Sequence, residues 1–182
     1  MAMREVAPVE ASELPLAELT AHLRLGTGFA DEGLEAPAVE RACRAALAAV
    51  ESRTGRALIA RDFVWRMWSS PRNGVAIAPL VPIVEVSSVE LVRGGERIAV
   101  SGWSATGDAL HGAPLVPMGG TAEVSLTAGM GAWAELPPDL AEAVLLIAAA
   151  LYEARGGAAP DVPETAHRLI APWRRLRIGG AG

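Results

Sequence analysis

The sequence of 182 residues contains neither lysine nor glutamine, so all 16 of its basic residues are arginines. The missing lysine excludes a Walker phosphate-binding loop, which needs that side chain for the phosphates. Its single cysteine, Cys43, excludes an internal disulfide bond. The net charge of -5 argues against a general nucleic-acid binder, because contacts to phosphates require a basic surface.

Long hydrophobic runs are also missing. No stretch reaches the roughly 18 apolar residues that suggest a membrane helix. The first residues, Met1 to Val6, lack the apolar segment of a signal peptide. We therefore expect a protein that is made in a reducing cytoplasm and stays soluble, with no membrane partner.

The most hydrophobic segment runs from Pro137 to Gly157. Its two leading prolines and Asp139 are typical of a helix start, and Gly156 is typical of a helix end. Only Glu142 is charged between Leu140 and Tyr152, which predicts a helix buried on all sides. We interpret this segment as the core helix on which the other elements pack.

Two helices are predicted before it. A short one begins at Pro15 and ends at Gly26, and a longer one extends from Pro37 to Thr54. The longer helix has one apolar stripe, formed by Val39, Cys43, Leu47 and Val50. Its charged residues, Glu51 among them, are expected in solvent, and Cys43 is expected in the core rather than as a nucleophile. Residues 1 to 11 show no such pattern and are expected to be mobile.

The middle of the chain alternates as strands do. The clearest strands are Ile59 to Trp68 and Thr121 to Ala128, joined by Ile83 to Val92 and a Gly94-Gly95 hairpin. Pro79 and Pro82 indicate an edge or a turn. The segment from Trp103 to Pro117 is predicted to be irregular.

These elements predict an α+β fold in one domain: a small helical bundle around a buried helix, an inserted antiparallel β-sheet subdomain and an extended C-terminal tail. The predicted parts are residues 12–55 (helical), 57–128 (β subdomain), 137–171 (helical) and 172–182 (docking tail). A last helix should begin at Pro163 and stop near Pro172.

Motifs for chemistry fail at required positions. The histidines, His22, His111 and His167, have no second histidine at metal-binding spacing. Ser104 follows Gly102 but lacks the second glycine of a nucleophile elbow, and the acids Asp31, Glu32 and Glu35 lack calcium-loop spacing. We predict no catalytic residue, no metal and no cofactor.

The tail alternates apolar and basic residues: Trp173, Arg174, Arg175, Leu176, Arg177 and Ile178. Apolar anchors and arginines that can pair with carboxylates are typical of a docking segment. We expect it to dock on another protein or on a neighbouring subunit. The alternatives are that the tail folds back on its own core or that it is disordered.

The order of short motifs resembles a known family. These motifs are Pro15 to Arg24, Glu51 to Leu58, Leu126 to Gly131, Leu136 to Leu140 and Leu151 to Arg155. Together they resemble the head-tail connector, or adaptor, family of long-tailed phages, and most closely the adaptor of gene transfer agents.

The resemblance implies a non-enzymatic structural protein of a virion or phage-like particle, located at the head-tail junction. Its subunits would form a ring, a dodecamer in the particle, beneath the portal protein. The ring would continue the channel for double-stranded DNA without sequence-specific binding and present its far side to a stopper or tail-completion protein.

Two other functions stay open on the residues alone. One is a small-molecule binding module or enzyme accessory subunit, with a site in the β subdomain near Trp65, Trp68 and Trp103. The other is a DNA-binding regulator, which the acidic balance disfavours.

Overall fold

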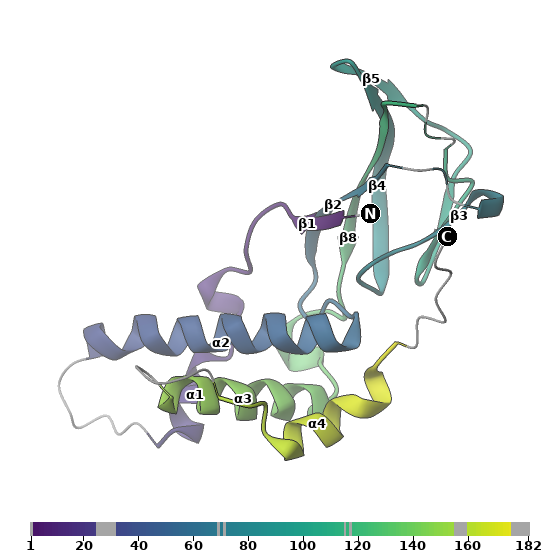
Figure 1. The fold of residues 1–182 in the computed structure, drawn as a ribbon. Coiled ribbons are helices and arrows are strands. Elements are labelled where there is room, and N and C mark those ends of the chain that lie inside the picture. Colours follow the sequence, from purple (N-terminus) through teal and green to yellow (C-terminus); the bar gives the residue numbers. More distant parts are fainter. Residues whose placement is uncertain are drawn as a thin grey trace. The chain divides into compact units, whose positions relative to one another are not determined.

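The computed structural model describes most of the chain. The described residues are 2–24, 32–68, 70, 72–114, 116, 118–154 and 160–175. The chain divides into two compact units, one of residues 1–9 and 56–131 and the other of residues 10–55 and 132–182. Among the described residues the first unit contains the β-strands and the second the α-helices, so the predicted α+β class is confirmed (Figure 1).

The helical unit is organised around α3 (Pro138–Glu153). This helix contacts α1 (Leu16–His22), α2 (Glu32–Thr54) and α4 (Glu164–Ile170) (Figure 1). Its buried residues are Leu140, Ala143, Val144, Leu145, Ile147, Ala148, Ala149 and Tyr152. The predicted core helix is therefore confirmed, although Leu146 and Leu151 are half-buried rather than enclosed. No helix among the described residues is long and apolar enough to cross a membrane.

The ends of two helices differ from the prediction. The helix α2 begins at Glu32, so Pro37 lies inside it. A proline this close to the start removes one backbone hydrogen bond and leaves the rest of the helix intact. The helix α1 ends at His22 because Arg24 adopts a left-handed conformation with φ of 52°, and the predicted stop at Gly26 lies outside the described residues.

The apolar stripe of α2 is confirmed, since Val39, Cys43, Leu47 and Val50 are all buried. The exposure predicted for Glu51 is wrong, because only 5% of this residue is accessible. Both α3 and α4 contact α2, so the buried face of this helix is wider than one stripe.

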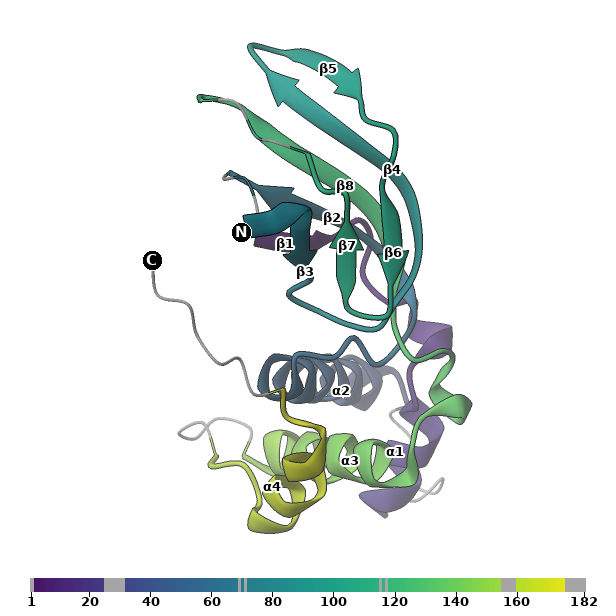
Figure 2. The same ribbon diagram turned by 90° about the vertical axis from the view of Figure 1, so that its right-hand side faces the viewer.

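The β unit consists of two antiparallel sheets. The five-stranded sheet has the order β1 (Ala2–Glu5), β2 (Arg61–Met67), β8 (Thr121–Ala128), β4 (Ile83–Arg93), β5 (Glu96–Ala99). The three-stranded sheet has the order β3 (Val75–Ile77), β7 (Ala109–His111), β6 (Ser104–Thr106). The two sheets face each other in Figure 2, and one hydrophobic cluster contains residues of both.

The alternation predicted for β2 and β8 is confirmed. Phe63, Trp65 and Met67 of β2 are buried, and β8 has the predicted bounds. The Gly94-Gly95 turn joins β4 to β5, and both glycines have the positive φ that a two-residue hairpin needs.

Three short strands were not predicted. The mobility expected at the N-terminus is wrong for β1, which pairs with β2, and the segment from Trp103 to Pro117 contains the hairpin of β6 and β7. Strands of three or four residues are too short for alternation to stand out, so their pairing is decided by the neighbouring strand.

A charged network lies on the five-stranded sheet. The carboxylate of Glu123 on β8 accepts hydrogen bonds from Arg66 at 2.6 Å and Arg97 at 2.7 Å, and Arg97 also pairs with Glu90 at 2.7 Å. Burial raises the pKa of Glu123, but the hydrogen bonds from the two arginines outweigh it, so the pKa is lowered. Glu123 therefore stays ionised although it is buried, with only 8% of the residue exposed.

We expect Ile147→Asp to abolish soluble expression. The side chain of Ile147 is 3% exposed, and an unpaired buried carboxylate costs several kcal/mol, a large part of the stability of a domain. Leu146→Asp on the same helix is the matched control, and its half-buried site should reduce the loss. The soluble yield of both variants tests this, and soluble Ile147→Asp protein with a near wild-type thermal melt would contradict the central role of α3.

We expect Glu123→Gln to remove part of the acid sensitivity of the fold. A lowered pKa stabilises the fold above the ordinary glutamate pKa of about 4.3, and this stabilisation is lost as the pH falls through the folded-state value. The variant should be less stable than wild type at neutral pH and approach it at about pH 3. Urea midpoints at both pH values measure this, with the exposed Glu85→Gln as control. Equal differences at both pH values would contradict the prediction.

Candidate functional site

The root of the C-terminal tail, residues 173–175, is attached to the helical unit by a side-chain hydrogen bond of Trp173. After α4, a 3-10 turn at Ala171–Trp173 places the indole of Trp173 beside the first turn of α3. Its Nε1–H donates to Oδ2 of Asp139 at 2.6 Å, and Oδ1 of Asp139 accepts the backbone N–H of Leu140 at 3.0 Å. A carboxylate is favourable at this helix end because the helix dipole is positive there.

A second contact follows two residues later. The backbone N–H of Arg175 donates to the carbonyl of Thr54, the last residue of α2, at 3.3 Å. Thr54 is itself buried, and its hydroxyl donates to the carbonyl of Val50 at 2.8 Å. The tail root is thus attached to both long helices of the unit.

The six residues of the predicted docking tail therefore fall into two groups. Trp173 and Arg175 are half-buried on the helical unit, while Arg174 between them is exposed. Leu176, Arg177 and Ile178 lie outside the described residues. For Trp173 the structure shows the fold-back alternative, and the docking role of the tail stays a prediction. The partners Asp139 and Thr54 were not predicted, because a contact between distant residues leaves no local pattern.

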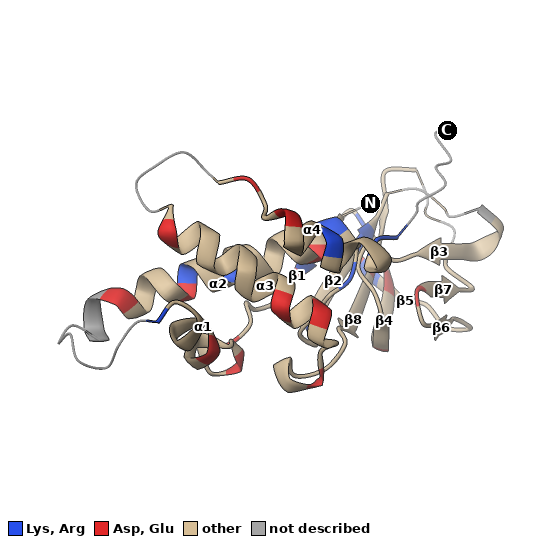
Figure 3. Ribbon diagram, turned by 90° about the horizontal axis from the view of Figure 1, so that it is seen from below, with Lys and Arg blue, Asp and Glu red and all other residues tan. Residues whose placement is uncertain are grey.

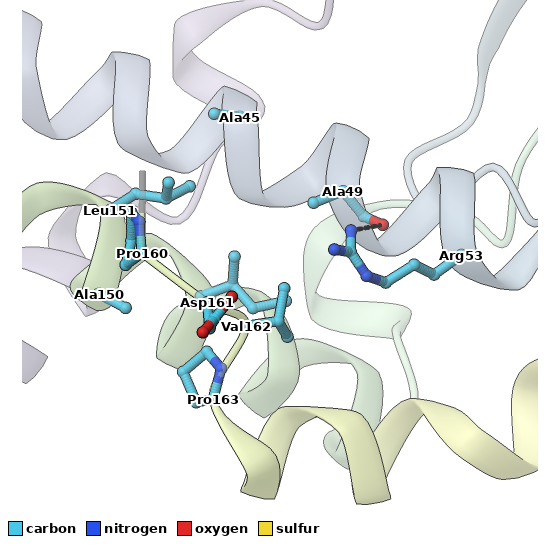
Figure 4. Close-up of a pocket in the computed structure, with 10 residues that line it drawn as sticks. Ala45, Ala49, Arg53, Ala150, Leu151, Pro160, Asp161, Val162 and Pro163 are labelled. Carbon is cyan, nitrogen blue, oxygen red and sulfur yellow. Dashed lines mark hydrogen bonds between the residues drawn. The ribbon is translucent and has the colours of Figure 1, made fainter. Parts of the chain in front are cut away.

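A small pocket lies in the helical unit between α2, α3 and the segment before α4 (Figure 4). Its volume is about 190 Å³. The lining residues are Ala45, Ala49, Arg53, Ile147, Ala150, Leu151, Pro160, Asp161, Val162 and Pro163. Arg53 is oriented by a bond of 3.1 Å from its guanidinium to the carbonyl of Ala49. The lining is mostly apolar, and its two charged residues are Arg53 and Asp161.

Charge is unevenly distributed over the helical unit. Acidic residues occur on all its helices, as the red segments of Figure 3 show. One of them, Glu35 on α2, accepts a hydrogen bond from the hydroxyl of Tyr152 on α3. Its carboxylate therefore connects these two helices. The helices α1 and α3 carry acidic residues and no arginine, whereas α2 and α4 carry residues of both signs and the tail root carries Arg174 and Arg175.

Reactive groups are not assembled into a site in the described part of the chain. Burial raises the pKa of Cys43 to about 11, more than the charge of Arg44 lowers it, so the thiol is protonated at neutral pH and is a poor nucleophile. No group of three or more His, Cys, Asp or Glu residues among the described ones is placed to hold a metal ion.

The tryptophans of the β unit have different environments. Trp65 is fully buried in the sheet core, and Trp103 is half-buried with its indole N–H on the carbonyl of Val100 at 3.0 Å. Trp68 follows β2 and is 55% exposed. A common binding site for these three side chains has no support in this arrangement.

Three solved structures contain chains similar to this one. A chain from the neck of an empty gene transfer agent (GTA) particle with C6 symmetry is 38% identical, with a TM-score of 0.88. A chain from the virion of a native GTA particle is 40% identical with a TM-score of 0.84, and one from a native GTA neck with C12 symmetry is 36% identical with a TM-score of 0.81. Each match covers 99% of this chain and 98% of the other.

This chain belongs to the head-tail adaptor family of gene transfer agents. The resemblance found in the sequence is thereby confirmed, and with it the role of a structural head-tail connector. Neither a protein-family model nor a curated protein matches the sequence.

We expect metal removal to leave this adaptor unchanged, because no metal-binding cluster occurs in its described part. Thermal melts with and without a chelator should coincide. Adding zinc or magnesium back after chelation is the control. A melting temperature that falls with the chelator and recovers with one of these ions would contradict the prediction.

Proposed function

We propose that this chain is the subunit of a ring in the neck of a gene transfer agent or phage-like particle, beneath the portal protein. The observation that carries the proposal is the 36% to 40% identity, over nearly the whole chain, to chains of GTA necks and virions. The ring would contain twelve subunits, which is the symmetry of one of these necks.

The charges of the helical unit support assembly through unlike surfaces. Its helices α1 and α3 carry acidic residues and no arginine, whereas the tail root carries Arg174 and Arg175. A contact between two different surfaces of identical subunits closes into a ring when the rotation permits. Complementary charges would orient such contacts more than they would strengthen them.

The ring has two further neighbours in this proposal. One side docks on the portal through the tail, and the other presents a surface to a stopper or tail-completion protein. Double-stranded DNA passes through the channel without sequence-specific contacts. The protein acts without catalysis, which the protonated Cys43 and the separated histidines of the described chain support.

We expect deletion of residues 176–182 to leave a folded protein that no longer joins the head. The cut follows Arg175, so both attachments of the tail root remain in place. Co-sedimentation with portal-bearing heads, run beside a thermal melt, measures both properties. A deletion variant that melts normally and still co-sediments would contradict docking through the tail.

The same assay separates charge from general surface effects. Arg174→Glu should weaken co-sedimentation about tenfold by repulsion from partner carboxylates. Arg168→Glu is the control, because Arg168 is 78% exposed on α4 and the charge change is the same. If full-length protein does not co-sediment at all, the proposed connection to the portal is wrong.

A further inference from the structure

The indole of Trp173 fastens the tail root to the start of α3. We propose that Trp173 is a positioning residue: it fixes the place of Arg174 on the helical unit, and the exposed side chain of Arg174 contacts the partner. This inference rests on the proposed function, because it concerns the same docking event.

The acceptor of this hydrogen bond is itself held in place. One carboxylate oxygen of Asp139 accepts the N–H of Leu140 at 3.0 Å while the other accepts the indole at 2.6 Å. Leu140 is fully buried in the helical core. The carboxylate of Asp139 therefore connects the indole of Trp173 to the backbone of α3.

The chain on either side of Trp173 is also restrained. Ile170, at the end of α4, is 1% exposed, and Pro172 restricts the backbone of the turn that follows. Beyond the indole, Arg174 is extended, with φ of -66° and ψ of 128°. The bond from Arg175 to the carbonyl of Thr54 then holds the next residue.

Arg174 lies between these two attachments, and its side chain is exposed. A charged group presented from a restrained backbone loses less conformational freedom on binding than one on a loose tail. The indole N–H of Trp173 serves the chain's own helix. Its contribution to docking is therefore to pre-organise the residues that follow, rather than to act as an anchor in the partner.

The helical unit offers a matched control for this bond. The indole of Trp133 also donates to a carboxylate, Glu18, at 2.9 Å, but far along the chain from the tail. Trp173→Phe and Trp133→Phe each remove one such N–H and keep an aromatic ring. A structural role alone predicts similar effects of the two changes on docking.

The test compares these variants in co-sedimentation with DNA-filled, portal-bearing heads that lack the adaptor. We expect Trp173→Phe to raise the concentration for half-maximal binding about tenfold, with a melt close to that of Trp133→Phe, which should bind as wild type. Backbone hydrogen exchange at Arg175 should be faster in Trp173→Phe alone. Wild-type binding by Trp173→Phe, or equal losses in both variants, would overturn the proposal.

Two further variants keep the test valid. If Trp173→Phe does not fold, two glycines inserted between Trp173 and Arg174 keep the indole hydrogen bond but displace Arg174, and wild-type binding by this insertion would overturn the proposal. Asp139→Asn retains an acceptor oxygen and should bind better than Asp139→Ala; equal binding would overturn it. Binding by full-length protein together with wild-type binding by Trp173→Phe rejects the positioning role and leaves the proposed function standing.

Discussion

The burial of α3 is the constraint on which the helical unit depends. This helix contacts α1, α2 and α4, and its small residues, such as Ala148 and Ala149, let neighbouring backbones approach closely. An apolar helix of this kind is stable only when other helices remove it from water. The same helix supplies Asp139, so the element that forms the core also holds the root of the tail.

The β unit reaches stability by a different route. Every second side chain of β2 and β8 lies in the core between the two sheets. Glu123, on the opposite face of β8, connects Arg66 and Arg97. A buried carboxylate is tolerated because two guanidinium groups replace its water. The outer face of the sheet is thus organised by ion pairs, and its inner face by apolar packing.

A connector has different requirements from an enzyme. It needs surfaces with a fixed relation to a stable core, and the hydrogen bonds of Trp173 and Arg175 provide this at the tail root. The cavity in the helical unit is small and mostly apolar, with Arg53 and Asp161 as its charged lining residues, and the buried thiol of Cys43 is protonated. In the described chain, the backbone around Arg174, where a partner is proposed to dock, is fixed by the hydrogen bonds of Trp173 and Arg175.

The sequence alone determined the long elements with a regular pattern of apolar residues. These are the apolar run of α3, the stripe of α2 and the alternation of β2 and β8. It also contained the ordered motifs of the adaptor family. A 38% identity to a GTA neck chain, in a match that covers 99% of this chain, confirms that family. Tertiary structure decided the short strands β1, β6 and β7, the burial of Glu51 and Glu123, and the partner of Trp173. The reason is physical: periodicity records which face of one element is buried, whereas a hydrogen bond between Asp139 and Trp173 depends on how separate elements pack.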